Sequence, residues 1–275
     1  MALDQRTPAQ LREHYEIEKS LADQLRNASC EERRVLYTSL YQEMYRRVPL
    51  HPQLVRSASP EETTRAVARQ MKFLRRFLKP AMTFLEVGPG DCALALEMTR
   101  HAKRVYAVDV AEMVSRDDVP PNFHFSLTDG SSIDVPENSV DLAFSNQVME
   151  HLHPDDAATQ LKNIYKALAP GGIYACITPN RLSGPHDISV FFDPVATGFH
   201  LKEYTVTELS ALFAEVGFVR IKSYLGPRRI YVRVPTFLFR WLEATLDALP
   251  PALRKRVART RVVRALLSII ITGSK

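Results

Sequence analysis

Two carboxylates and two glycines stand at positions that suit the binding of a nucleoside. A short apolar run ends at Glu86, and Gly88 and Gly90 follow before a helix-forming stretch. A strand that turns on glycines into a helix exposes backbone N–H groups and lets a ligand approach closely. Asp109 ends the next apolar run, where a carboxylate can accept hydrogen bonds from both hydroxyls of a ribose.

The acidic residue at the start of this turn restricts the charge of the ligand that can bind there. A phosphate pocket rarely has a carboxylate beside the anion, because like charges repel. Glu86 therefore favours a cationic or zwitterionic group, and the pattern predicts a nucleoside with a positively charged arm. The same residue argues against a nicotinamide dinucleotide, whose pyrophosphate would lie beside it. An ordinary tight turn is the structural alternative for the glycines.

At this point the chain resembles the class I S-adenosylmethionine-dependent methyltransferases, over roughly residues 60 to 222 and the final strand. The segment Glu86-Val87-Gly88-Pro89-Gly90-Asp91-Cys92 is similar to the acidic glycine motif of that family, with Cys92 in place of a third glycine. The chain is most similar to the small-molecule group that includes the ubiquinone-biosynthesis O-methyltransferases. The resemblance implies S-adenosylmethionine as the cofactor and methyl donor.

The resemblance also implies which residues contact this donor. An ordinary turn after the third strand and a helix cap after the fourth are the structural alternatives for two of the groups. The implied set is Glu86, Gly88 and Gly90 at the methionine arm, Asp109 at the ribose, Asp129 and Gly130 at the adenine, and Ser145, Asn146 and Gln147 at the sulfonium and methyl group.

Histidines are the candidate catalytic residues. Methyl transfer from a sulfonium is an in-line displacement, so the protein mainly aligns the reacting groups. A hydroxyl acceptor must also lose a proton, and histidine titrates in the useful range. His151 follows the fourth strand, and His200 lies in a loop where related enzymes place acceptor-side residues. His153 and His186 are further candidates, and alignment without any base is the alternative. We expect no metal site.

Alternating strand and helix patterns must position these residues. Apolar runs with strand character alternate with helical stretches from residue 82 to residue 226, and a β-branched run ends the chain. This alternation predicts an α/β fold with a doubly wound, mostly parallel, seven-stranded sheet of the Rossmann-like methyltransferase type. Right-handed crossovers place the carboxyl ends of the strands, and any ligand, at one edge of the sheet.

Four regions are predicted along the chain. The first is an N-terminal helical lid, where Tyr37, Tyr41 and Tyr45 recur with helical spacing; plain helix packing is the alternative. A capped helix beginning near Ser59 opens the donor-binding core. The regions are the lid at 1–58, the core at 59–226, a basic helical insertion at 227–264 and the final strand at 265–275.

Basic residues concentrate in the C-terminal part of the chain. Between Arg220 and Lys275, thirteen Lys or Arg residues stand against two acids, a net charge of +11, whereas the whole chain carries +5. Such a segment favours an anionic partner, and peripheral contact with an anionic membrane is one interpretation. A solvated basic face is the other. Nucleic acid is an unlikely partner, because the motif of amino methylases is absent after the fourth strand.

Composition and cysteine content indicate the location. The three cysteines are far apart, and no apolar run reaches about 18 residues, so we expect a cytoplasmic protein, with or without membrane association. The predicted function is S-adenosylmethionine-dependent methyl transfer to a small-molecule acceptor, at an oxygen of a sugar, a lipid-linked compound or a secondary metabolite. The alternative is a catalytically silent nucleoside-binding or interaction module on the same fold.

Overall fold

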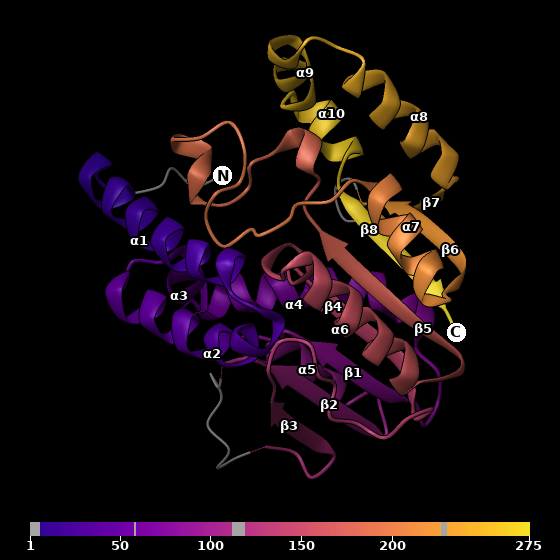
Figure 1. Cartoon of the computed structure of the whole chain (residues 1–275). Coiled ribbons are helices and arrows are strands. Elements are labelled where there is room, and N and C mark those ends of the chain that lie inside the picture. Colours follow the sequence, from indigo (N-terminus) through magenta and orange to yellow (C-terminus); the bar gives the residue numbers. More distant parts are fainter. Residues whose placement is uncertain (1–5, 58, 112–118, 227–229) are drawn as a thin grey trace.

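One mixed sheet forms the centre of the protein. The computed structural model describes residues 6–57, 59–111, 119–226 and 230–275. Helices cover both faces of the sheet (Figure 1), and the strand order is β3-β2-β1-β4-β5-β8-β6-β7. The strands are β1 (Thr83–Val87), β2 (Arg104–Asp109), β3 (Phe123–Leu127), β4 (Val140–Asn146), β5 (Leu168–Thr178), β6 (Val219–Leu225), β7 (Val232–Val234) and β8 (Ile269–Ser274).

The first five strands are parallel, which brings their carboxyl ends to one edge. Strand β8 is antiparallel to both β5 and β6, between which it lies. The doubly wound α/β sheet predicted from the sequence is confirmed, but the predicted number of seven strands is one too low. The extra strand β7 pairs with β6 at the outer edge and comes from the region predicted as a purely helical insertion. Three residues are too few to show a strand pattern.

The N-terminal region consists of three helices, α1 (Pro8–Asn27), α2 (Cys30–Arg47) and α3 (Pro52–Ser57). Thr7 and Ser29 cap α1 and α2, and each forms a capping box with the residue three positions later. A capping box satisfies two backbone N–H groups that a helix start leaves unpaired. The Ser29 cap therefore starts α2 as a separate helix, two residues after α1 ends at Asn27.

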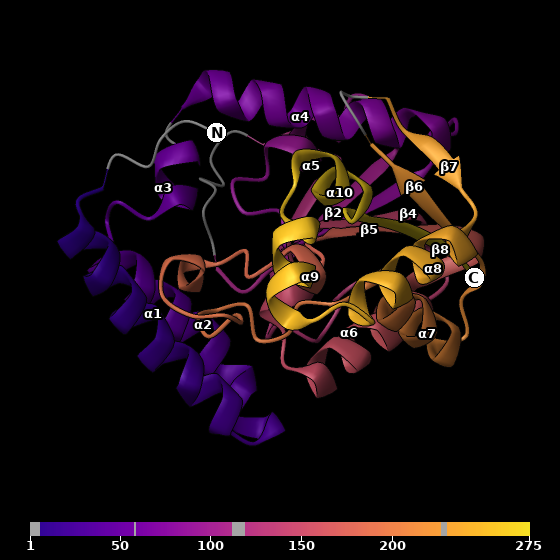
Figure 2. The same cartoon turned by 90° about the horizontal axis from the view of Figure 1, so that it is seen from above.

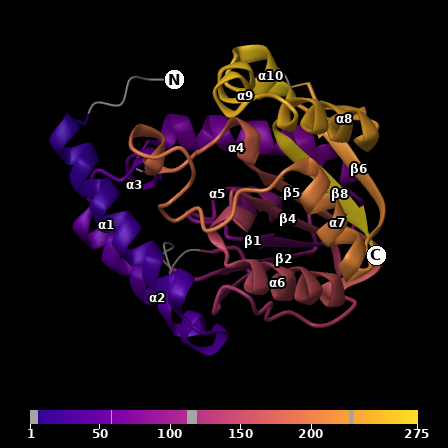
Figure 3. The same cartoon turned by 45° about the horizontal axis from the view of Figure 1, so that its top comes forward.

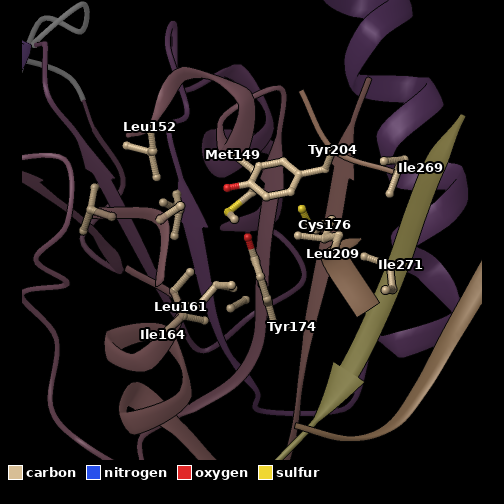
Figure 4. Close-up of a cluster of buried hydrophobic side chains, with 14 of the residues drawn as sticks. Met149, Leu152, Leu161, Ile164, Tyr174, Cys176, Tyr204, Leu209, Ile269 and Ile271 are labelled. Atoms are coloured by element: carbon tan, nitrogen blue, oxygen red, sulfur yellow. The ribbon is translucent and has the colours of Figure 1, made fainter. Parts of the chain in front are cut away.

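Two apolar cores hold the sheet, one on each face. Helices α4 (Pro60–Leu74) and α5 (Ala93–Met98) cover one core. Helices α6 (Pro154–Ala167) and α7 (Val206–Val216) cover the other, which Figure 4 shows around Tyr174 and Leu161. Ile269 and Ile271 of β8 are completely buried in this second core. Full burial stabilises the fold by roughly 1.5–3 kcal/mol for each isoleucine, so the last strand is part of the main core.

The last helices, α8 (Thr236–Asp247), α9 (Pro251–Ala258) and α10 (Arg261–Leu266), form a group at one end of the molecule (Figures 1 and 2). They have a small core of their own that includes Leu182 and Leu246. Buried Glu243 of α8 accepts hydrogen bonds from the backbone N–H groups of Val206 and Thr207 at the start of α7. A carboxylate is favoured at a helix N-terminus, and here it joins α8 to the core. Within the described residues, no helix is long and apolar enough to cross a membrane.

Candidate active site

A pocket that is partly open to solvent lies at the carboxyl edge of the sheet. Residues at the ends of β1, β2 and β4 line it, together with the tyrosines of α2. Figure 3 shows α1 and α2 along one side of the sheet, away from α8. Of the residues predicted to contact the donor, the pocket is lined by Gly88, Gly90, Asp109, Gly130 and Gln147.

The turn after β1 depends on its glycines. Gly88 and Gly90 have φ angles of +66° and +57°, which are unfavourable for residues with a Cβ. A Cβ on Gly88 would lie 2.3 Å from Cγ2 of Val148, whereas one on Gly90 would meet only the end of Gln53 at 3.4 Å. The turn therefore presents bare backbone to the pocket.

Asp109 at the end of β2 organises this turn. Its Oδ2 accepts a hydrogen bond from the Gly90 N–H at 2.9 Å, and its Oδ1 accepts from Val110 at 2.7 Å and Ala111 at 3.2 Å. Burial raises the pKa of the Asp109 carboxyl, although these N–H groups act in the opposite direction. The side chain thus fixes the glycine turn and lines the pocket at the same time.

Glu86 lies beneath the turn and does not line the pocket. Its side chain is buried, and Oε2 has no hydrogen-bond partner within the described residues. Burial, followed by the charges of Asp91 and Asp109, raises the pKa of Glu86 well above its usual range. A buried acceptor without a partner beside two other carboxylates fits a site that receives a cationic ligand.

Asp129 is engaged in its own turn. Its Oδ1 accepts hydrogen bonds from the backbone N–H groups and the hydroxyls of Ser131 and Ser132. Burial opposes ionisation, but these bonds outweigh it and lower the pKa of Asp129. The pocket is lined by Gly130 and not by Asp129. The ordinary-turn alternative therefore describes this side chain, which does not itself line the pocket.

The three candidate residues at the end of β4, Ser145, Asn146 and Gln147, lie in different surroundings. Ser145 is fully buried, and its hydroxyl is 2.6 Å from that of Tyr174. Asn146 is the last residue of β4, and neither Ser145 nor Asn146 lines the pocket. Gln147, with a φ of +60°, does line the pocket.

Gln160 of α6 lines the donor side of the pocket and was not identified from the sequence. Its Nε2 donates a 2.6 Å hydrogen bond to the carbonyl of Gly130, which fixes the orientation of the amide. Its buried Oε1 has no partner within the described residues. This leaves one oriented hydrogen-bond acceptor beside Gly130. The only signal in the sequence is a polar residue on a helix face that is apolar apart from Asp156.

The tyrosine wall is fixed by a buried ion pair. Arg33 donates to both oxygens of Asp156, at 2.5 and 3.0 Å. The Tyr37 hydroxyl donates to Asp156 at 2.8 Å and accepts from the backbone N–H of His153 at 2.9 Å. These bonds join α2 to α6 and fix Tyr37. Tyr37, Tyr41 and Tyr45 all line the pocket, and the role of this region as a lid stays a prediction.

His151 is a neutral histidine in the pocket wall. Its Nδ1 lies 3.2 Å from the carbonyl oxygen of Phe199, so Nδ1 must carry the hydrogen that is donated. Burial, followed by the nearby charge of His200, lowers the pKa of His151 to about 3. The other nitrogen, Nε2, therefore keeps its lone pair at neutral pH.

His200 lies behind His151 and does not line the pocket. The two ring centroids are 4.8 Å apart, edge to face. Burial disfavours the charged form of His200, but the 2.7 Å hydrogen bond to Glu203 and the charges of Glu150 and Asp187 outweigh it and raise the pKa to about 9. His200 is therefore an imidazolium at neutral pH.

The other two candidate histidines have local roles. His153 caps α6 by accepting a hydrogen bond from the backbone N–H of Asp155. The backbone N–H of His186 donates to Glu203 at 2.7 Å, and its ring lies 3.3 Å from the same carboxylate.

Within the described residues, two clusters have ligand atoms within 4.8 Å of one another and could approach a shared metal ion: His14, Glu18 and His51, and Glu150, His151 and His200. Hydrogen bonds within the protein already engage both clusters, for example His14 to Glu18 at 2.7 Å. We therefore assign neither cluster as a metal site, and the expectation of no metal stays a prediction.

Comparison with known proteins identifies the family. Residues 60–223 match the model of a methyltransferase domain. A probable S-adenosylmethionine-dependent methyltransferase of Mycolicibacterium smegmatis is 31% identical over 147 residues, 52% of this chain and 53% of that protein. One of Mycobacterium tuberculosis is 30% identical over 156 residues, 54% of each chain. The matched segment thus spans about half the length of these relatives.

A shorter match and two solved structures complete the comparison. A wheat phosphoethanolamine N-methyltransferase is 31% identical over 98 residues, 33% of this chain and 20% of that protein. An S-adenosylmethionine-dependent methyltransferase from Archaeoglobus fulgidus shares the fold with a TM-score of 0.54 at 16% identity, covering 78% of this chain and 94% of that one. The Haemonchus contortus phosphoethanolamine N-methyltransferase 2 has a TM-score of 0.50 at 16% identity, over 75% and 52% of the two chains.

The matched domain covers more than half of the chain and contains the glycine turn, Asp109 and His151. The chain belongs to the family of S-adenosylmethionine-dependent methyltransferases of class I, in which S-adenosylmethionine is the methyl donor.

Proposed function

We propose that the protein transfers the methyl group of S-adenosylmethionine to an oxygen of a small, uncharged acceptor. The observation that carries this proposal is a single pocket with two different walls. One wall holds the glycine turn and Asp109, and the other holds His151 and the tyrosines of α2. Because both walls face one space, a donor and an acceptor can meet there in line.

The donor side fits a cationic nucleoside. When bound, S-adenosylmethionine supplies a methyl group already activated on a sulfonium. In our proposal the bare turn at Gly88 and Gly90 lets the donor approach, and Asp109 takes the ribose. Glu86 lies behind the turn, and the positive charge of the methionine arm would favour the ionised form of its buried carboxyl. Opposite charges attract strongly in a buried site, which supports a cation near Glu86.

Gln160, and not Asp129, is the proposed partner of the adenine amino group. Oδ1 of Asp129 is occupied by the two serines that follow it and Oδ2 lies 3.6 Å from Arg34, whereas Oε1 of Gln160 is buried, oriented and without a partner among the described residues. A buried acceptor without a donor is costly, by about 1–3 kcal/mol, so a ligand N–H at this point would be favoured. Gln160→Leu is expected to weaken donor binding more than Asp129→Asn does.

The acceptor side favours an uncharged molecule with a hydroxyl. Among the described residues that line the pocket there is no lysine or arginine, so a phosphate group would have no cationic partner. This argues against an acceptor like the phosphoethanolamine for which the wheat relative is named. The tyrosine wall offers flat apolar surface, and Nε2 of His151 offers an acceptor for a hydroxyl proton. A phenol, a sugar or the head of a lipid-linked compound meets these conditions.

We propose different roles for the two histidines. A group with a pKa of about 3 is too weak a base to hold a proton at neutral pH, so His151 orients the hydroxyl by hydrogen bonding. His200, which is charged and lies outside the pocket wall, acts as a positioning residue whose positive charge adds to the effect of burial in keeping His151 neutral. Alignment by the protein then provides most of the acceleration.

The cytoplasmic location expected from the cysteine pattern stays part of this proposal. So does a peripheral contact of the basic C-terminal segment with an anionic membrane, which its charge of +11 between residues 220 and 275 supports.

Calorimetry and a turnover assay test the proposal. We expect S-adenosylmethionine to bind, Asp109→Ala to weaken that binding at least tenfold, and His151→Asn to lower kcat with donor affinity unchanged. His124→Asn, an exposed histidine on β3, is the matched control. Labelled methyl transfer to phenols and sugars reports activity. Absence of donor binding by the folded protein would refute the proposal, whereas donor binding without turnover on any acceptor would favour the silent module.

A further inference from the structure

Helix α8 has apolar side chains on two opposite faces. Phe239 and Leu246 point into the protein and are buried. On the other side, Phe237 and Trp241 stand one turn apart and are 66% and 69% exposed, and Leu238 next to them is 45% exposed. A helix that is apolar all round is normally buried on all sides. The apolar composition of the outer stripe of Phe237, Leu238 and Trp241 therefore predicts a buried surface, whereas the stripe is exposed.

Positive charge surrounds this outer stripe. Between residues 230 and 266, eight Arg or Lys residues stand against Glu243, which is buried, and Asp247, a net charge of +6. Arg233 and Arg240, beside the stripe, are both exposed. Asp247 is already paired with Arg254 at 2.9 Å, so the exposed charge of this region is almost entirely positive.

The neighbouring helix α10 repeats the combination. Val262 is 70% exposed and Leu266 is 36% exposed, one turn apart, and they alternate with exposed Arg261 and Arg264. Figures 1 and 2 show α8, α9 and α10 as one group on the outside of the fold. Aromatic and aliphatic side chains flanked by arginines are typical of helices that lie in the interface of a membrane.

We propose that the outer stripe of α8, extended by the exposed residues of α10, is a docking surface for a bilayer that contains anionic lipids. Charge complementarity selects this partner: the apolar side chains enter the boundary of the acyl chains while the arginines meet lipid phosphates. Trp241 suits this position, since tryptophan is enriched at membrane–water interfaces.

Docking at this surface would also fix how the acceptor side of the pocket is oriented relative to the membrane. Glu243 of α8 accepts a hydrogen bond from Asn180 at 2.9 Å, and Arg259, which directly follows α9, donates to the Gly184 carbonyl at 3.1 Å. Both partners belong to the loop after β5, the same long connection that continues to Phe199 and His200. This consequence rests on the proposed function, and it favours a lipid-linked acceptor over a free one.

The sole tryptophan of the chain makes the test direct. Trp241 is the only tryptophan among 275 residues, so the emission of the full chain reports the environment of the stripe. With vesicles of phosphatidylcholine and phosphatidylserine at low salt, we expect a blue shift and quenching by lipids with brominated acyl chains. Vesicles of phosphatidylcholine alone should give a much weaker effect.

Sedimentation with the same vesicles tests the residues. Phe237→Ser with Trp241→Ser should lower the partition coefficient at least tenfold, because two large apolar side chains are lost. Arg240→Gln, Arg261→Gln and Arg264→Gln together should lower it by roughly a hundredfold, at about fivefold for each cation. The matched controls are Val35→Ser, 72% exposed on α2, and the triple Gln variant of Arg46, Arg65 and Arg100, all well exposed. The controls should bind like the parent protein.

Two outcomes overturn the proposal. One is unchanged Trp241 emission and no sedimentation with anionic vesicles at low salt. The other combines two results: without lipid, the emission of Trp241 shifts with protein concentration, and sedimentation velocity shows a dimer that the Phe237/Trp241 variant does not form. A second copy of the chain would then cover the stripe. All measurements omit the methyl donor, so a failure of docking is distinguishable from a failure of the proposed methyl transfer.

Discussion

Replacement of Gly88 by alanine is expected to destabilise the protein through two effects that the structure allows to be separated. The first is backbone strain, because φ at this position is +66°. The second is a steric clash, because the new Cβ would lie 2.3 Å from Cγ2 of Val148. Valine is branched at Cβ and has few alternative rotamers, so the clash is not easily relieved.

The two effects have different sizes and different controls. A non-glycine residue in the left-handed region costs about 1–2 kcal/mol. Overpacking adds about 1–3 kcal/mol, so Gly88→Ala should lower the free energy of unfolding by about 2–5 kcal/mol. Gly171 has a φ of +76°, but a Cβ added there would meet nothing within 4 Å, so Gly171→Ala carries the strain alone. It should cost only about 1–2 kcal/mol.

Urea unfolding of four variants measures these quantities. In Gly88→Ala, the added Val148→Ala change removes the clashing methyl and leaves Cβ of residue 148 at 3.5 Å, an ordinary contact. A double-mutant cycle should therefore show a favourable coupling of about 1–3 kcal/mol. If Gly88→Ala loses no more stability than Gly171→Ala, or if the coupling is zero, the account of the turn is refuted. Donor affinity, measured by calorimetry, should fall in Gly88→Ala and recover partly in the double variant.

Three further predictions concern stability. The pKa of His200 is raised to about 9 in the folded protein, against about 6.5 in the unfolded chain. The pairing of His200 with Glu203 therefore stabilises the fold fully below pH 6.5, and this stabilisation is lost as pH rises through 9. His200→Gln should remove this pH dependence of the free energy of unfolding, which is on the order of 3 kcal/mol in urea unfolding between these pH values. Asp156→Asn leaves the buried Arg33 guanidinium without its carboxylate and should cost about 3–5 kcal/mol, whereas Asp155→Asn, 77% exposed, should change thermal stability little. Ile271→Ala should lower the free energy of unfolding by about 2–5 kcal/mol in urea unfolding, because this side chain of β8 is fully buried.

The sheet and the donor edge were predictable because their signals are local. Apolar runs separated by helical stretches define parallel strands, and the carboxyl ends of such strands must share one edge. Gly88, Gly90, Asp109 and Gly130 could therefore be expected there from the sequence, and all four line the pocket. Their contacts with the donor stay a prediction.

What the sequence could not show depends on contacts between distant segments. The pairing of Arg33 with Asp156 spans 123 positions, and no local pattern indicates it. Gln160 becomes relevant only because its amide reaches the Gly130 carbonyl from another element. The opposite charge states of His151 and His200 also arise from tertiary neighbours, since the two residue types are identical in the sequence. Strand β7 is too short to produce a periodic signal.

The position of β8 in the sheet has a consequence for folding while the chain is synthesised on the ribosome. Strand β6 bonds to β5 only through β8, which is synthesised after both of them. Until residues 269–274 emerge, the edges of β5 and β6 that β8 will join carry unpaired N–H and C=O groups. The nascent chain then exposes strand edges that can pair with another chain. A delay in translation across the arginine-rich stretch between β6 and β8 would lengthen that exposure, so the interval before β8 emerges is a stage of synthesis at which the chain is open to aggregation or to protection by a chaperone.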